Sequence, residues 1–202
     1  MNQGKRNIIF ICILFFVIVS LSACSSSSGV PNDNTGGDEE NLVWSSHSGN
    51  DFSFDYPSEW NLNRNHEALV EFESLYSDMY SSGMVAEPEN NDSKLFLTMA
   101  LDVEAYFEAP LTDRDLEDFA VGFNDSYIAS SEDNPELIEE ARLTVDGNSA
   151  IRLTYNISQD RASFVITYKG YYYYFIGYGS HKDNYNDMLS LYTEMMDSLT
   201  LH

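Results

Sequence analysis

Cysteine is nearly absent from this sequence of 202 residues, and its scarcity excludes several kinds of site. The two cysteines are Cys12 and Cys24, and both precede every stretch with the composition of a folded domain. The chain beyond Cys24 therefore has no disulfide framework, no cysteine-containing zinc site and no cysteine nucleophile. Such a domain must rely on its hydrophobic core, and a chain of about 150 residues buries about 68–70% of its unfolded surface.

Basic residues are also scarce, with 10 lysines and arginines against 33 acidic residues and a formal net charge of −23. Lys5 and Arg6 precede Cys24, so the chain from Cys24 onward has eight basic residues against 33 acidic ones, a balance of −25. This charge repels phosphate backbones and anionic lipid headgroups, which excludes nucleic acid as a partner. A protein with a basic contact surface, or a cation, remains compatible with it.

Catalytic motifs are missing as well. The sequence has no His-Glu-x-x-His, no Gly-x-Ser-x-Gly and no glycine-rich phosphate loop. Gly179–His181 places a serine beside a histidine, but we interpret it as the connection from the last strand to the last helix. We therefore predict a protein that is not an enzyme and uses no cofactor.

The N-terminus has the features of a secretory signal. Lys5 and Arg6 precede the unbroken apolar run Ile8–Val19, and Leu21–Cys24 reads Leu-Ser-Ala-Cys. This combination resembles the signal of bacterial lipoproteins, in which the cysteine thiol receives a diacylglyceryl group and the preceding bond is cut. The alternative, an uncleaved membrane-spanning helix, needs about 20 apolar residues, and the run is shorter than that. The resemblance implies a signal peptide over residues 1–23, lipid attachment at Cys24 and a location on the extracytoplasmic face of the cell membrane.

Residues 24–42 are predicted to form a flexible tether. The stretch Ser25–Asn41 consists almost entirely of Ser, Gly, Asn, Asp and Glu and cannot bury enough apolar surface to order itself. A flexible chain of this length has a root-mean-square reach of roughly 20–25 Å. Asp38, Glu39 and Glu40 could be interpreted as a cation site, but nothing fixes a ligand geometry, so a solvated acidic tether is favoured. The remainder, residues 43–202, is predicted to be one domain.

The first half of this domain is predicted to be mostly β-structure. Phe52–Tyr56 alternates between apolar and polar residues, which is typical of a half-buried strand, and Ala68–Glu73 shows the same alternation. Between them Trp60 is expected to fill one end of the core. Ser81–Ser93 contains glycine, proline and paired asparagines and is predicted to be a loop. Lys94–Asp102 has apolar residues on both faces, so we expect a strand near the centre of its sheet.

Two helices are predicted. The first begins after Thr112, a good N-cap, and has apolar residues at helical spacing. This stripe consists of Leu116, Phe119, Ala120, Phe123 and Tyr127. Asp113 and Asp115 are interpreted as acids at the positive end of the helix dipole, because the Gly and Glu of a calcium-binding EF-hand loop are missing at the required offsets. A second amphipathic helix is predicted over about Asp183–Leu199.

Between these helices the sequence predicts an antiparallel meander of three or four strands over Glu139–Phe175. Apolar and polar residues alternate on both sides of the turn Asp146–Asn148, and Asp-Gly between two such runs is a strong hairpin signal. A second hairpin is expected about Lys169 and Gly170. Strands joined so tightly must be antiparallel neighbours.

Four consecutive tyrosines, Tyr171, Tyr172, Tyr173 and Tyr174, are open to two interpretations. Aromatic residues are common in strands, and consecutive strand residues point to opposite faces, which favours a structural role. If one face of the sheet is open to solvent, two of the four would form a contact patch for a peptide, a carbohydrate or a partner protein.

The segment Phe52–Trp60 reads Phe-Ser-Phe-Asp-Tyr-Pro-Ser-Glu-Trp and resembles the opening Phe-x-Tyr-Pro-x-x-Trp motif of PsbP-like domains. This is the family of the extrinsic photosystem II protein and of many bacterial lipoproteins. The last predicted hairpin, Tyr168–Tyr172, and the helix ending at Asp197–Leu199 agree with that family over roughly Val43–Leu201. The resemblance implies an α/β (α+β) fold, a PsbP-like sandwich in which helices flank a central antiparallel sheet. It transfers no binding site.

These observations leave two functional hypotheses. The first is a membrane-anchored, non-enzymatic accessory lipoprotein that binds another protein of the cell envelope. The second is a lipoprotein that binds a small solute or a divalent cation, which the acidic charge of the chain motivates. An enzyme is the least favoured class, because no catalytic motif is present.

Overall fold

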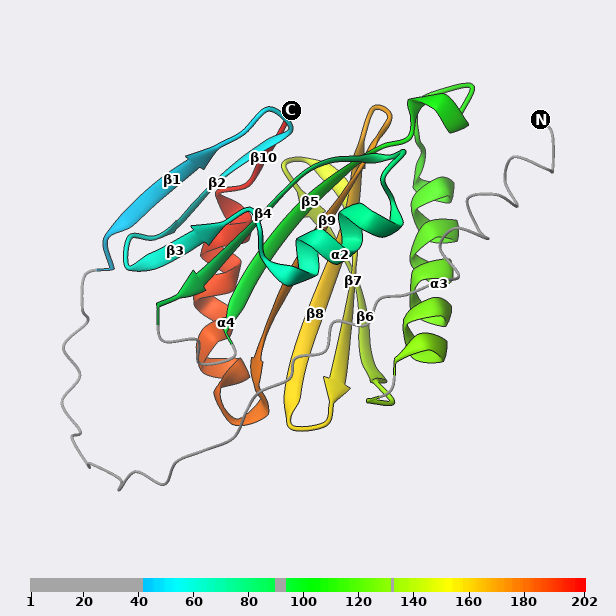
Figure 1. The fold of residues 1–202 in the computed structure, drawn as a ribbon. Coiled ribbons are helices and arrows are strands. Elements are labelled where there is room, and N and C mark those ends of the chain that lie inside the picture. Colours follow the sequence, from blue (N-terminus) through cyan, green and yellow to red (C-terminus); the bar gives the residue numbers. More distant parts are fainter. Residues whose placement is uncertain (1–41, 90–93, 132) are drawn as a thin grey trace, which may run out of the picture.

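A seven-stranded antiparallel sheet forms the central layer of the computed structural model, which describes residues 42–89, 94–131 and 133–202 (Figure 1). Its strand order is β3-β4-β5-β9-β8-β7-β6. The bounds are β3 Trp60–Asn63, β4 Tyr80–Pro88, β5 Leu95–Asp102, β6 Glu136–Val145, β7 Asn148–Ile157, β8 Asp160–Lys169 and β9 Tyr172–His181. A smaller sheet of three strands has the order β1-β2-β10, with bounds Trp44–Ser48, Phe52–Pro57 and Thr200–Leu201.

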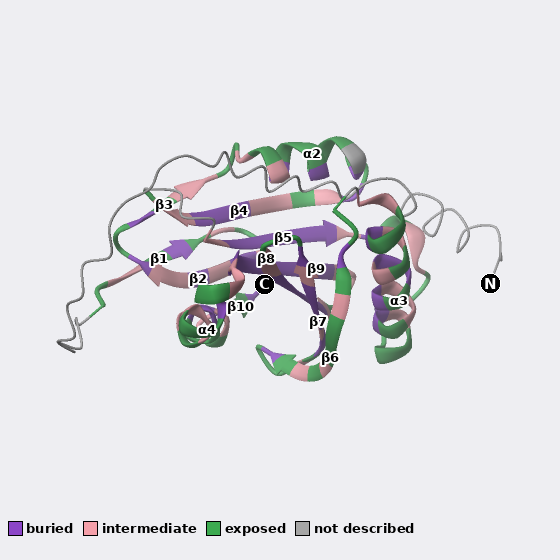
Figure 2. Cartoon of the chain, turned by 90° about the horizontal axis from the view of Figure 1, so that it is seen from below, coloured by how far each residue is buried: buried purple, intermediate pink, exposed green. Residues whose placement is uncertain are grey.

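Both faces of the large sheet are covered (Figures 1 and 2). Helices α2, Glu67–Leu75, and α3, Asp113–Ser130, pack on one face, and a short 3-10 helix at Glu104–Tyr106 precedes α3. Helix α4, Lys182–Asp197, and the small sheet pack on the other. Two separate hydrophobic cores result, one on each face. The predicted fold class, a central antiparallel sheet flanked by helices, is confirmed.

The interior strands β5 and β9 divide their side chains between the two cores. In β5, Leu97, Met99 and Leu101 contact the helices α2 and α3, whereas Phe96 and Ala100 face α4 and the small sheet. This alternation follows from the period of two along a strand, and apolar residues at successive positions require an interior place in the sheet. The prediction of a central strand over Lys94–Asp102 is confirmed.

The predicted meander is also confirmed, and it comprises β6, β7, β8 and β9 in order. Asp146 and Gly147 join β6 to β7 with φ values of 47° and 74°, as a two-residue turn matched to the twist of the strands requires. Gly170 has φ of 63° in the turn before β9. Glycine adopts this conformation without the steric cost that a side chain would add.

The α3 helix begins as the sequence predicts. Thr112 is its N-cap, and Thr112 and Asp115 form a capping box in which the Thr112 backbone N–H donates to Asp115 Oδ2 at 3.0 Å. The Asp113 carboxylate accepts a hydrogen bond from the Tyr168 hydroxyl at 2.9 Å. Hydrogen bonds from Ser149 and Tyr168 lower the pKa of Asp113. These two acids thus stabilise a helix terminus and its contact with the sheet.

The strand predicted at Ala68–Glu73 is wrong, because this segment lies in α2. Leu69 and Phe72 of the helix and its C-cap Tyr76 are buried, and Val70 is 52% exposed. These buried positions have helical spacing. A segment this short also fits the alternation of a strand, so its sequence pattern alone does not distinguish the two. His66 begins the helix, since its Nδ1 accepts a hydrogen bond from the Ala68 backbone N–H at 3.2 Å.

The loop predicted at Ser81–Ser93 is also wrong over most of its length, because β4 runs to Pro88 and pairs with both β3 and β5. In the sequence Gly83 suggests a loop, but in the structure it lies in β4 directly beneath α2. A Cβ atom at this position would lie 2.7 Å from Leu69 Cδ2 and 2.5 Å from the Tyr80 hydroxyl oxygen. Glycine therefore allows α2 to approach the strand closely. Residues 90–93 lie outside the described part of the chain.

Other boundaries differ less. Trp60 is 6% exposed and packs in the core, as predicted, and α4 matches the predicted final helix. The interpretation of Gly179–His181 as a connection is wrong, because β9 extends through these residues and His181 caps α4 directly. The signal peptide, Cys24 and the tether up to residue 41 lie outside the described residues. Within the described ranges, no helix is long and apolar enough to cross a membrane.

We expect Gly83→Ala to lower the free energy of unfolding by about 1–3 kcal/mol, because the new methyl group overpacks the contact between α2 and β4. Urea unfolding of both proteins measures the difference. Gly177→Ala is the matched control, since its Cβ would meet Leu97 Cδ2 at 3.3 Å and nothing closer. If both variants lose the same free energy of unfolding, the close approach of α2 does not explain why residue 83 is a glycine.

Candidate functional site

A polar cleft of about 410 Å³ opens where the turn between β1 and β2 faces the start of β4. Its volume falls in the range of small-molecule sites. The turn Ser48–Asp51, the β4 residues Tyr80–Met84, and the side chains of His47 and Arg64 line it. Segments distant in sequence thus meet at one end of the molecule.

The Asp51 carboxylate organises one wall of the cleft. Its Oδ2 accepts a hydrogen bond from the Ser81 hydroxyl at 2.8 Å and another from the Ser82 hydroxyl. The Asp51 backbone oxygen also accepts a hydrogen bond from the backbone N–H of His202 at 2.8 Å. Asp51 therefore links the first hairpin to β4 and to the C-terminal strand β10.

His47 forms the buried end of the cleft. The side chain is 8% exposed and packs against the rings of Phe52 and Phe54, with centroid distances of 5.7 and 5.4 Å. Burial lowers the pKa of His47, and the positive charge of Arg64 lowers it further. Arg64 itself is exposed at the rim. The cleft thus presents a guanidinium group, a carboxylate and a neutral imidazole.

This arrangement differs from that of a serine hydrolase. In a catalytic triad the carboxylate orients a histidine, and the histidine takes the proton from the serine. Here both serine hydroxyls donate directly to Asp51, and His47 packs against two phenylalanine rings. The groups of the cleft are suited to hydrogen bonding and charge pairing with a polar ligand.

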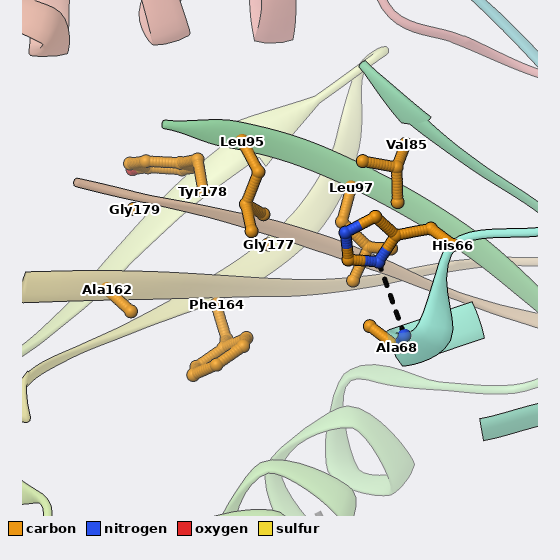
Figure 3. A pocket seen from close by; sticks show the side chains of 10 residues that line it. All are labelled: His66, Ala68, Val85, Leu95, Leu97, Ala162, Phe164, Gly177, Tyr178 and Gly179. Carbon is orange, nitrogen blue, oxygen red and sulfur yellow. Dashed lines mark hydrogen bonds between the residues drawn. The ribbon is translucent and has the colours of Figure 1, made fainter. Parts of the chain in front are cut away.

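A second, smaller pocket lies on the α2 face of the large sheet, beside the start of α2 (Figure 3). Its volume is about 40 Å³. Leu95, Leu97 and Phe164 give it an apolar lining, and Gly177 contributes to the floor without a side chain. His66 lies at its margin, with Nε2 3.7 Å from Glu87 Oε2. The space suits a methyl-sized group and is too small for a metabolite.

His66 and His181 occupy equivalent positions at two helix starts. Each uses Nδ1 to accept a backbone N–H, from Ala68 at 3.2 Å and from Asp183 at 3.4 Å. Each imidazole therefore acts as an N-cap. Neither was predicted in this role, because histidine is not among the favoured capping residues.

The tyrosine run does not form the contact patch that the sequence allowed, because both faces of the sheet are covered at β9. Tyr173 and Tyr174 are buried in opposite cores. The Tyr173 hydroxyl donates to the Asp115 backbone oxygen at 3.0 Å, and the Tyr174 hydroxyl donates to the His202 backbone oxygen at 2.7 Å. These two side chains are core residues whose polar ends are satisfied internally.

Tyr171 and Tyr172 are half-buried at the end of the sheet. The Tyr172 hydroxyl donates to Asp102 Oδ2 at 3.3 Å, and burial together with this carboxylate raises the pKa of Tyr172. Only this pair of the four could contribute to a surface, and the two residues lie at a turn rather than across a flat face.

Acidic residues are abundant on α3 and on β6, the outer strand at the other edge of the large sheet from β3 and β4. Between Asp113 and Arg142 there are ten acidic residues and two arginines, a balance of −8. The next forty residues, 143–182, have a balance of +2. Among the described residues, no group of three or more His, Cys, Asp or Glu side chains is placed to hold a metal ion.

The cleft has no signature in the sequence, because its groups come from segments that show no common motif. Asp51 and Arg64 lie in short polar stretches, and Ser81 and Ser82 fall where a loop was predicted. Arg64 gave the only usable signal, because a basic residue is uncommon in so acidic a chain.

The described fold is PsbP-like. The solution structure of cyanobacterial PsbP (CyanoP) from Synechocystis sp. PCC 6803 superposes with a TM-score of 0.59 at 15% sequence identity, over 84% of this chain and 98% of that one. A crystal structure from Bacteroides thetaiotaomicron VPI-5482 has a TM-score of 0.45 at 13% identity, over 75% of this chain and 45% of that one. Neither protein-family models nor curated proteins give a match. At this identity the likeness establishes the fold and leaves function to the chain's own residues.

We expect the stability of the protein to decline as the pH falls below about 6.5, in part because of His47. Its pKa is lower in the folded state, so the unfolded chain takes up a proton that the folded chain does not. The stability deficit of His47→Gln relative to the unaltered protein should therefore shrink between about pH 7.5 and 5.5. Urea unfolding at both pH values measures it. A deficit that is the same at both would contradict the lowered pKa.

Proposed function

We propose that this chain is a membrane-anchored extracytoplasmic lipoprotein that acts as a non-enzymatic, protein-binding accessory module. Cys24, at the end of the lipoprotein-like signal, is the attachment point for the lipid. A single lipid chain binds membranes weakly, and a diacylglyceryl group supplies two chains, enough for stable anchoring. The acidic segment after Cys24 separates the domain from the membrane surface.

The observation that carries the protein-binding part is the acidic surface on α3 and β6. The exposed acids include Glu117 and Asp125 on the helix, and Glu139 and Glu140 on the strand, and Asp118 on the helix is half-buried. Exposed apolar side chains occur among them, Val121 at 61% and Ile128 at 43%. A surface that combines apolar groups with one sign of charge favours a protein partner with a complementary basic surface.

A photo-cross-linking residue at Val121 of the full chain, expressed in cells, should capture a partner protein. Charge reversal of Glu117, Asp118 and Asp125 to lysine should reduce the captured amount by about tenfold, because electrostatic attraction between complementary surfaces is lost. The cross-linked product is measured by mass spectrometry. High salt applied to permeabilised cells should also reduce the captured amount, because salt screens the attraction between the charged surfaces.

A cross-linker at Asn61, an exposed position on β3, is the matched control and should capture less of this partner. Cys24→Ser should move the chain from the membrane fraction to the soluble fraction. Capture that is insensitive to both salt and charge reversal would refute binding through the acidic surface. A chain that keeps residues 1–23 in the membrane would refute the lipid anchor.

The polar cleft favours a second candidate function, a lipoprotein that binds a small solute. Arg64 and Asp51 place a positive and a negative group on the walls of one cleft of about 410 Å³. A zwitterion such as a free amino acid has complementary charges, since its carboxylate can pair with a guanidinium and its ammonium with a carboxylate. No solute class with a single charge would use both groups.

Isothermal titration of the full chain, purified in detergent, with each of the common amino acids tests this candidate. We expect at least one to bind, and Arg64→Ala to weaken that binding by about tenfold through the lost charge-assisted hydrogen bond. Arg114→Ala, on the exposed surface of α3, removes the same charge away from the cleft and should leave the affinity unchanged. If none of the amino acids gives a heat of binding, the cleft does not bind a zwitterionic amino acid.

A further inference from the structure

The outer strand β6 presents an open edge of the large sheet. It has ten residues and pairs only with β7 among the described strands, whereas the opposite outer strand, β3, has four. Exposed edges of this length are uncommon, since an edge offers unpaired backbone groups to any other strand. β6 therefore has the form of a strand that can accept a neighbour.

The register identifies which backbone groups are free. The turn at Asp146 and Gly147 has two residues, so Val145 and Asn148 exchange hydrogen bonds, and such pairs recur at every second position along β6. The N–H and C=O groups of the intervening residues point away from β7. These residues are Glu140, Arg142 and Thr144, and all three are exposed. They offer three donors and three acceptors in a row.

Side chains along this edge select the kind of strand that can pair with it. Glu136, Glu139 and Glu140 are exposed and acidic, and two copies of β6 placed side by side would bring like charges together. Two nearby arginines offset only part of this charge. Arg142 pairs with Glu117 of α3 at 2.8 Å, and Arg152 of β7 pairs with Glu139 at 2.8 Å, so Glu136 and Glu140 carry the charge that an added strand would meet. These carboxylates disfavour pairing between two copies of β6. They attract instead an extended segment that contains lysine or arginine.

Apolar groups along β6 would gain from such a neighbour. Ile138 lies at an irregularity in the pairing with β7 and is 41% exposed, and Ala141 and Leu143 are half-buried on one face of the strand. An added strand would cover part of this surface with its own alternate side chains. A basic segment with apolar residues at every second position satisfies both requirements.

We propose that β6 accepts an extended, basic segment of the partner protein as an additional antiparallel or parallel strand of the sheet. The inference rests on the proposed function for the existence of that partner and deepens it by defining the contact. Backbone hydrogen bonds to Glu140, Arg142 and Thr144 hold the segment. Its basic residues lie on the α3 face of the sheet, beside Glu140, and its apolar residues lie on the other face, beside Ala141 and Leu143.

The test uses the full chain, purified in detergent, and a short peptide in which lysine and valine alternate. Amide hydrogen exchange followed by NMR should show new protection at Glu140, Arg142 and Thr144 when the peptide is added. A peptide of alternating glutamate and valine should give none. Arg142→Pro removes the central outward N–H without removing a hydrogen bond to β7, and it should weaken binding by about tenfold or more.

Arg142→Ala is the matched control, because it loses the same ion pair with Glu117 but keeps the N–H, and it should bind like the unaltered chain. Equal affinity of the two variants for the peptide would overturn the proposal, as would peptide-induced protection confined to α3. Protection of the three amides before any peptide is added would mean that the chain itself covers the edge, and would also overturn it.

The outcome is separable from that of the proposed function. If the peptide fails to pair with β6 while cross-linking in cells persists, the edge is not the contact and the accessory role stands. If the peptide pairs with β6 while no partner is captured in cells, the edge can accept a strand but the accessory role is refuted.

Discussion

The structure depends on one constraint, that a seven-stranded sheet is buried on both faces. Strand β9 lies at its centre and shows the constraint most directly, because Tyr173 and Phe175 enter one core and Tyr174 and Ile176 enter the other. A strand of this kind has no face left for solvent. Every layer of the molecule, α2 and α3 on one side and α4 with the small sheet on the other, exists to cover one of these two faces.

This burial leaves the ends and edges of the sheet as the places where the domain can contact other molecules. The polar cleft lies at an end, where the first hairpin meets β4 and the C-terminal strand. The acidic surface lies over α3 and along β6, the outer strand at the other edge of the sheet from β3. The two regions differ in chemistry, since the cleft combines both signs of charge around Asp51 and Arg64, whereas the edge is acidic with free backbone groups. The proposed solute site and the proposed protein contact therefore occupy different parts of the molecule.

The fold was predictable where local signals and tertiary packing agree. The Asp146–Gly147 hairpin and the stripe that includes Leu116 and Phe123 are such cases, because turn chemistry and periodicity each allow one structure. The predictions failed at Ala68–Glu73 and around Gly83, where a short segment satisfies two periods or a glycine fits the close approach of a helix. The candidate sites could not be predicted, because register and packing bring Asp51, Arg64 and Ser82 together and decide which groups of β6 point outward.

The sequence by itself determined the absence of thiol chemistry from the domain, its strongly negative charge, the lipoprotein-like Cys24 and the order of the meander, since each depends on composition or on contacts between near neighbours in the chain. Only the tertiary structure decided that Tyr173 and Tyr174 belong to the core, that His66 and His181 cap helices, and that β6 is the open edge. These features depend on which elements lie on either side of a strand. Long-range packing sets that arrangement, and no local pattern records it.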